Sequence, residues 1–248
     1  MRSNALAPLK TWLDAALNLF YPPACQICSN ERATVDEGFV CRSCWHGVRF
    51  VQRPFCERCG LPYEGSITNE FECTNCREIQ LHFSTARSAV IANPLILEVI
   101  HHYKYNRALW FEPFLAGLLV QQARPLLQRD SWDMIVPVPL HPVKQREREF
   151  NQADRLARHL GAATGLPVRN RLIRRVAPTR TQTLLSRQER ADNVRRAFAP
   201  CRETSLAGAR VVVLDDVMTT GATTSACARV LRKMGAADVC VWTVARGV

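Results

Sequence analysis

The chain has 248 residues, of which 33 are lysine or arginine, 22 are aspartate or glutamate and 47% are hydrophobic. An apolar fraction of this size belongs to a folded chain and excludes wholesale disorder. No apolar run reaches the roughly 20 residues that a membrane-spanning helix needs, so we expect no membrane insertion.

The first predicted element is a leading amphipathic helix within residues 1–24, because its apolar residues recur at helical spacing. Lys10 and Asp14 interrupt the apolar core that a secretory signal peptide would require, so we expect a cytoplasmic protein. In that reducing compartment, the eleven cysteines are not expected to form disulfides.

Four Cys-x-x-Cys pairs follow between residues 25 and 76. Two such turns that face each other supply four thiolates at tetrahedral corners and leave no vacancy for water, which is typical of structural Zn²⁺. The spacing therefore predicts a double zinc ribbon over residues 25–80, with disulfides, a single occupied site, an iron–sulfur cluster or interleaved pairing as alternatives. In sequential pairing, the ligands are Cys25, Cys28, Cys41 and Cys44 for the first site and Cys56, Cys59, Cys73 and Cys76 for the second.

Charge divides the chain unevenly. Residues 1–80 carry a net charge of −1, to which each Cys₄ zinc site would add −2, whereas residues 81–248 carry +12. Nine arginines and two acidic residues fall within residues 169–196 alone. The ribbons thus have the wrong sign for a nonspecific phosphate surface, and we expect them to serve as a scaffold or to bind proteins.

The rest of the chain alternates between predicted strands and helices, which is typical of an α/β domain, here over residues 86–248. The expected strands are 87–92, 133–138, 171–176, 210–214 and 238–244, and the expected helices are 95–105, 112–124, 150–163 and 221–234.

Residues 210–235 carry the most specific pattern. An apolar run is closed by Asp215 and Asp216, and a small hydroxylated loop then leads into a helix that begins near Gly221. The free N–H groups and positive dipole end of such a helix attract a phosphate group. The two carboxylates would repel a bare phosphate, but they would accept hydrogen bonds from hydroxyl groups. A sugar phosphate satisfies both demands.

The stretch LDDVMTTGATT resembles the phosphoribosyl-pyrophosphate (PRPP) loop of type I phosphoribosyltransferases. A proline-rich loop and helix start over 134–152 and a basic segment over 174–198 extend the likeness. With the cysteine pairs in front, residues 20–246 resemble the ComF/GntX family of competence-related phosphoribosyltransferase-like proteins. The resemblance implies a type I phosphoribosyltransferase-like parallel sheet flanked by helices and preceded by the double zinc ribbon.

The resemblance also implies an activity, the displacement of pyrophosphate from the ribose C1 of PRPP by a nitrogen nucleophile, with Mg²⁺ on the leaving pyrophosphate. Asp215 and Asp216 would hold the ribose hydroxyls in the catalytic site. Contacts to the phosphates would come from Thr219, Thr220, Gly221, Ala222 and Thr223 at the 5′-phosphate, from Lys144, Arg146 and Arg148 at pyrophosphate, and from Arg180 and Gln182 in a covering loop.

One departure from the family pattern weighs against efficient pyrophosphate chemistry: Glu149 stands where the family usually has glycine. The rival hypothesis is a catalytically inactive PRPP-fold module that binds single-stranded DNA and competence or recombination proteins. The +12 charge of residues 81–248 favours that rival through counterion release. The paired acids favour an enzyme or a PRPP sensor, and the sequence does not identify an acceptor.

Overall fold

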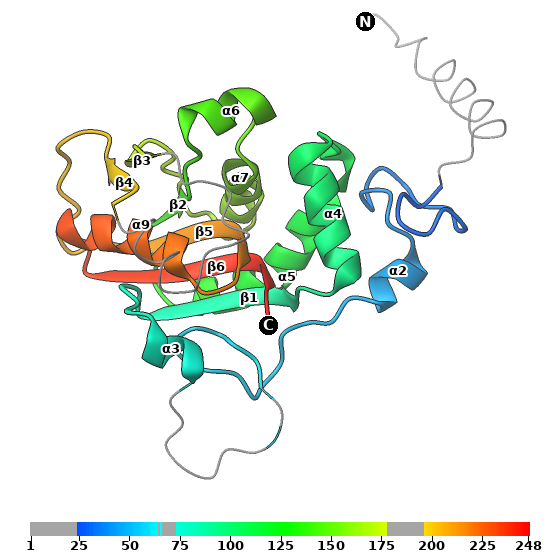
Figure 1. Cartoon of the computed structure of the whole chain (residues 1–248), viewed down its shortest axis with the longest axis horizontal. Helices are drawn as coiled ribbons and strands as arrows, with labels where there is room; N and C mark the ends of the chain where they lie inside the picture. Colours follow the sequence, from blue (N-terminus) through cyan, green and yellow to red (C-terminus); the bar gives the residue numbers. More distant parts are fainter. Residues whose placement is uncertain (1–23, 64, 66–72, 178–195) are drawn as a thin grey trace, which may run out of the picture.

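A computed structural model describes residues 24–63, 65, 73–177 and 196–248, so the predicted leading helix lies almost wholly outside the described residues. Four parallel strands form the central sheet in the order β1–β6–β5–β2 (Figure 1). The two central strands consist mostly of buried residues, as expected when both faces of a sheet are covered. The predicted parallel α/β sheet is confirmed, with β1 at Thr85–Ile91, β2 at Met134–Pro137, β5 at Arg210–Met218 and β6 at Asp238–Arg246.

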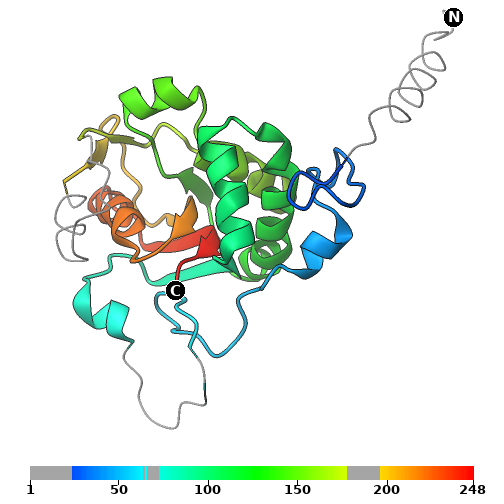
Figure 2. The same cartoon turned by 45° about the vertical axis from the view of Figure 1, so that its right-hand side comes forward.

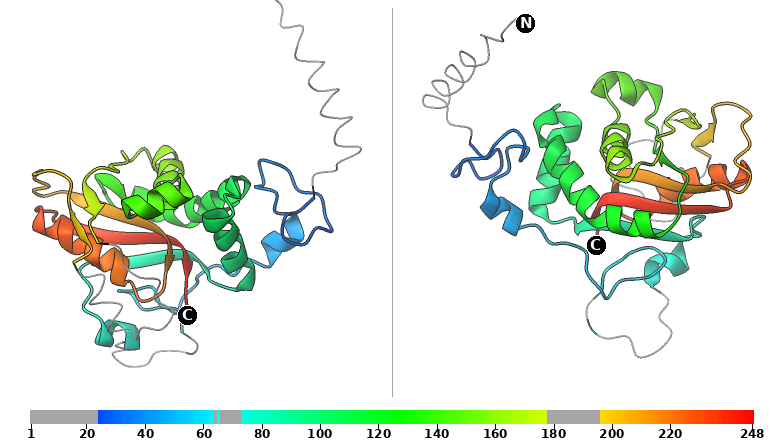
Figure 3. Two further views of the ribbon diagram at one scale, coloured as in Figure 1. Left: turned by 45° about the horizontal axis from the view of Figure 1, so that its top comes forward. Right: turned by 180° about the vertical axis from the view of Figure 1, so that it is seen from behind.

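Helices cover both faces of this sheet, as the rotated views show (Figures 2 and 3). Helices α5 and α7 pack together on one face, and α9 packs against β5 and β6 on the other. Helix α4 follows β1, and Asn93 caps it by accepting a hydrogen bond from the N–H group of Ile96 at 3.0 Å. The helices are α4 (Pro94–Tyr105), the 3₁₀ helix η1 (Leu109–Phe111), α5 (Glu112–Arg129), α6 (Pro142–Arg148), α7 (Gln152–Thr164) and α9 (Ala222–Lys233).

Some predicted boundaries differ from the structure. Helix α5 runs past Pro125 to Arg129, because a proline removes only one backbone donor and the buried Leu127 still anchors the last turn. Helix α6 lies in a segment predicted as a proline-rich loop. Strand β3 (Ile173–Arg175) pairs antiparallel with β4 (Phe198–Pro200) outside the main sheet. No helix in the described ranges is long and apolar enough to cross a bilayer.

The two cysteine-rich segments contact different parts of the α/β domain. The first, with helix α2 (Arg42–His46), lies beside α4 and α5, where Trp45 packs edge-on against Phe114 with ring centroids 4.8 Å apart (Figure 1). The second, with helix α3 (Thr74–Glu78), lies below β1, and its buried residues continue into the hydrophobic core of the sheet. The first segment adds a small cluster of its own around Ala33.

Candidate functional site

The eight predicted zinc ligands come together in two clusters. Within each cluster the sulfur atoms all lie within 4.8 Å of one another, and neighbouring sulfurs are 3.4–3.8 Å apart. Tetrahedral zinc with Zn–S distances of about 2.3 Å places its sulfurs about 3.8 Å apart, so the donor sets fit this metal. None of the eleven cysteines forms a disulfide in the structure, which argues against the disulfide alternative. Sequential pairing is confirmed, with Cys25, Cys28, Cys41 and Cys44 in one site and Cys56, Cys59, Cys73 and Cys76 in the other.

Local backbone geometry builds these sites. Cys41 and Cys73 are the N-cap residues of α2 and α3, and each sulfur accepts a hydrogen bond from the backbone N–H group three residues later. Gly60 adopts a left-handed conformation (φ +66°), and a Cβ atom there would lie 2.6 Å from the carbonyl oxygen of Ala86. Only glycine fits so close an approach, so the turn that carries Cys56 and Cys59 packs directly against β1.

The loop between β5 and α9 forms a small hollow at the carboxyl end of the sheet. Gly221 occupies the N-cap position at φ +83° and has no side chain to cap the helix. Thr220 Oγ1 accepts from the N–H group of Ala222 at 3.3 Å, and the following N–H group of the first turn has no side-chain cap among the described residues. These donors and the positive end of the helix dipole suit an anion. The hollow measures about 40 Å³ and is lined by Asp215, Val217, Met218, Thr219, Thr220, Gly221, Ala222, Thr223 and Thr224.

The two predicted carboxylates lie on opposite faces of β5. The sequence suggested that the strand ends at Leu214, but β5 continues to Met218, and successive side chains along a strand alternate between faces. Asp215 lines the hollow of the β5–α9 loop. Asp216 is 3% exposed, and its Oδ2 atom forms an ion pair with Lys104 Nζ at 2.6 Å.

Burial, together with the charge of Asp216, raises the pKa of Asp215 to about 7, and the charge of Lys104 opposes the shift. Burial lowers the pKa of Arg175 in β3, and the charge of Asp215 opposes that change. A carboxyl group with a pKa near neutral pH, next to a loop that suits a bound anion, is typical of a functional site.

The three basic residues predicted for pyrophosphate all lie on α6. Lys144 is exposed and pairs with Glu147 at 2.7 Å, Arg146 is exposed, and Arg148 stacks over the ring of Tyr105. No hydrogen bond or ion pair among the described residues joins them to the hollow of the β5–α9 loop, although the charge of Arg148 acts on Arg175, which also interacts with Asp215. The predicted contacts from Arg180 and Gln182 lie outside the described residues.

Glu149 ends α6 in the left-handed conformation at φ +66°, with its carboxylate paired to Arg107 at 2.9 Å. Few non-glycine residues adopt this conformation, so the position favours glycine for a backbone reason.

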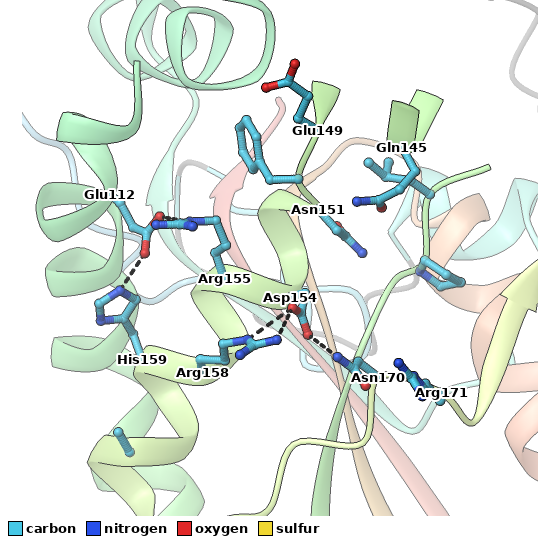
Figure 4. Close-up of a pocket in the computed structure, with 14 residues that line it drawn as sticks. Glu112, Gln145, Glu149, Asn151, Asp154, Arg155, Arg158, His159, Asn170 and Arg171 are labelled. Carbon is cyan, nitrogen blue, oxygen red and sulfur yellow. Dashed lines mark hydrogen bonds and ion pairs between the residues drawn. The ribbon is translucent and has the colours of Figure 1, made fainter. Parts of the chain in front are cut away.

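A larger cavity of about 930 Å³ lies between α5, α6 and α7 (Figure 4). At one side of this cavity, the buried Glu112 accepts hydrogen bonds from Tyr103, Arg155 and His159 (Figure 4). Burial alone would raise the pKa of Glu112, but these donors lower it to about 2. None of the residues of the β5–α9 loop lines this cavity, so the cavity is separate from the hollow of the β5–α9 loop.

Sequence reasoning missed three residues that shape the β5–α9 loop. Lys104 pairs with Asp216, Asn75 contacts the loop backbone, and Arg246 is buried beneath it. Lys104 is one of only four lysines in an arginine-rich chain, which is a weak signal. The other two carry no signal that the sequence alone reveals.

The fold and the two cysteine sites define a double-zinc-ribbon protein with a parallel α/β domain. The sequence model of the family described as "Double zinc ribbon domain" matches residues 16–80. Similar proteins extend over nearly the whole chain, and by these relatives the chain belongs to the competence protein F (ComF) family.

Among these relatives, "Competence protein F" of Haemophilus influenzae is 31% identical over 84% of this chain and 97% of its own. "DNA utilization protein YhgH" of Salmonella typhimurium is 33% identical over 92% of this chain and 99% of its own. "Competence protein ComFC" of Bacillus subtilis is 26% identical over 84% of each chain. A solved glutamine PRPP amidotransferase from B. subtilis, complexed with ADP and GMP, overlaps 51% of this chain and 24% of its own, with 25% identity and a TM-score of 0.34.

Proposed function

We propose that this chain binds PRPP together with Mg²⁺ and transfers its phosphoribosyl group, in a cytoplasmic process of DNA uptake or utilisation. The observation that carries the proposal is the β5–α9 loop. It joins a helix N-terminus whose N-cap residue has no side chain, a glycine at φ +83° and the carboxylate of Asp215 in one hollow. A ligand with both phosphate and hydroxyl groups matches these donors and this acceptor.

Each part of the hollow has a role in this proposal. The 5′-phosphate would accept hydrogen bonds from the backbone and hydroxyl groups of residues 219–223. Asp215 would accept from a ribose hydroxyl group. Asp216, held by Lys104, would keep the strand end and its charge in place. Lys144, Arg146 and Arg148 would meet pyrophosphate, and Arg180 and Gln182 would belong to the covering segment.

Magnesium would arrive with the ligand. The described residues contain no cluster of three or more carboxylate or histidine ligands outside the cysteine sites, and Mg²⁺ commonly binds through one carboxylate, several waters and substrate phosphates. Asp215 fits that single-carboxylate role. Bound Mg²⁺ would neutralise the charge of the leaving pyrophosphate.

Titration calorimetry with PRPP and Mg²⁺ tests the proposal. Asp215→Asn removes the accepting charge at nearly constant size, and we expect PRPP affinity to fall by about 1.5–3 kcal/mol, the cost of a hydrogen bond to a charged group. Asp130→Asn is the matched control, because Asp130 lies just beyond the C-terminus of α5 and, among the described residues, its carboxylate forms an ion pair with its neighbour Arg129 alone. PRPP binding that is unchanged in Asp215→Asn would contradict the assigned role.

The second candidate function is a PRPP-fold module without turnover that binds single-stranded DNA and competence or recombination proteins. It is favoured by the +12 charge of residues 81–248 and by Glu149 at the end of α6. A screen of nucleobases and amines for pyrophosphate release separates the two. Release with any acceptor supports the transferase, whereas salt-dependent DNA binding without release supports the module.

A further inference from the structure

The side chain of Arg246 lies beneath the β5–α9 loop and donates hydrogen bonds to its backbone. It lies at the end of β6, is 1% exposed and pairs in register with Met218 of β5. Its Nη1 atom donates to the carbonyl oxygens of Met218 at 3.1 Å, of Gly247 at 2.6 Å and of Thr219. Arg246 therefore holds the backbone at the point where β5 becomes the loop.

This guanidinium group has no carboxylate partner among the described residues, and its Nε atom is buried without a hydrogen-bond acceptor there. A buried charge is costly unless an opposite charge lies nearby. The guanidinium group contacts the second cysteine cluster through a hydrogen bond to the side chain of Cys59. Burial lowers the pKa of Arg246, and the charge of Cys59, this hydrogen bond and the charges of Cys73 and Cys76 oppose that shift. With zinc bound, a Cys₄ site carries a net charge of −2, which supplies the missing counter-charge.

A second link runs from the same site to the same loop. Asn75 stands between two cysteines of the second site, is 4% exposed, and donates from Nδ2 to the carbonyl oxygen of Thr220 at 3.1 Å. Two side chains thus hold three consecutive carbonyl groups, from Met218 to Thr220. Asn75 belongs to the second zinc site, and Arg246 faces that site. The first site contacts α5 instead, around Phe114.

We propose that Arg246 and Asn75 are positioning residues that couple the second zinc site to the β5–α9 loop. Zinc retention at this site and the shape of the loop then depend on each other. The second site consists of Cys56, Cys59, Cys73 and Cys76. The further step, that zinc occupancy sets the affinity for PRPP, rests on the proposed function. Loss of the ion would free the cysteine segments that carry Asn75 and face Arg246, and it would release the carbonyl groups that these two residues hold.

Four variants of the full-length zinc protein test the coupling: Arg246→Met, Arg246→Lys, Asn75→Ala and the matched control Ser43→Ala. Ser43 is exposed and occupies the same position in the first site as Asn75 in the second. Native mass spectrometry during chelator titration counts the zinc ions. Alkylation of released thiols and peptide mapping assign each lost ion to a site, and hydrogen exchange follows the amide groups of residues 218–224.

In Arg246→Met, we expect second-site zinc to bind about 10–100-fold more weakly, as for other residues that support metal ligands, with first-site zinc unchanged and loop exchange faster. Arg246→Lys should recover zinc retention in part, because it keeps the charge without the planar fork. Asn75→Ala should speed loop exchange, and Ser43→Ala should change neither readout.

Equal loss of zinc from both sites in Arg246→Met, or an unchanged second site with unchanged loop exchange, would overturn the coupling. If Arg246→Met does not fold, the same criteria apply to Arg246→Lys and Asn75→Ala. The zinc and hydrogen-exchange measurements need no PRPP. If the wild-type protein fails to bind PRPP, the proposed function is refuted, and zinc retention and hydrogen exchange still test the coupling. Where PRPP binds, coupling is reciprocal, and PRPP should slow zinc loss from the second site alone.

Discussion

Glu149 adopts a backbone conformation that disfavours any side chain. Its ion pair with Arg107 joins two groups that are more than half exposed, and such pairs stabilise proteins little. We expect Glu149→Gly to raise the free energy of unfolding by about 0.5–1 kcal/mol relative to Glu149→Ala, because left-handed strain outweighs the added entropy of glycine in the unfolded chain. Urea denaturation measures both variants. Equal stabilities would show that no strain is stored there.

Asp215 links protein stability to pH. Its folded pKa is raised from 3.8 to about 7, so the folded protein holds the proton more tightly than the unfolded chain. The resulting stabilisation is complete below the unfolded pKa and is lost as pH rises through the folded pKa.

We therefore expect the free energy of unfolding of the wild-type protein to fall, relative to Asp215→Asn, between about pH 4 and pH 7. Denaturation at a series of pH values measures this difference. Parallel curves for wild type and Asp215→Asn would contradict the raised pKa.

At the scale of elements, the two ribbons have little apolar core of their own, and the first rests on a cluster of only three buried residues, two of them ligands. Metal binding must therefore supply much of their folding free energy. Elemental analysis should find two zinc ions per chain, and chelation should lower the melting temperature.

Cys28→Ser removes one ligand of the first site, and we expect it to bind one zinc ion per chain. Cys201→Ser is the control, because Cys201 lies outside both clusters, and it should keep two. A wild-type protein with one zinc ion or none would contradict the assignment of both sites.

Over the whole molecule, the separation of charge predicts where a polyanion binds. Arg171 and Arg174 are exposed on the α/β domain, whereas Arg175 is partly buried and its charge interacts with that of Asp215. Neutralising the first two should reduce the salt dependence of single-stranded DNA binding by up to about 1.4 in slope, at about 0.7 for each phosphate contact. Arg42 and Arg49, exposed in the ribbons, serve as controls. If only the ribbon variants lose DNA binding, the zinc sites contact the nucleic acid.

The sequence by itself determined the eight cysteine ligands, the alternation of strands and helices and the loop that precedes α9, but it left open which cysteine pairs share a site. Each depends on local signals: cysteine pairs a few residues apart, buried apolar runs, and a glycine at a helix start. Residues close in the chain meet whatever the rest of the fold does, so their spacing is sufficient to predict them.

Only the tertiary structure decided how that loop is held. The extension of β5 to Met218 placed Asp215 and Asp216 on opposite faces, and helix α4 supplied Lys104 to Asp216. Asn75 reaches the loop across 145 residues of sequence. Such contacts arise from strand register and from the packing of distant segments. Local sequence propensities do not encode the register or the packing, because both depend on how all the strands pair in the sheet.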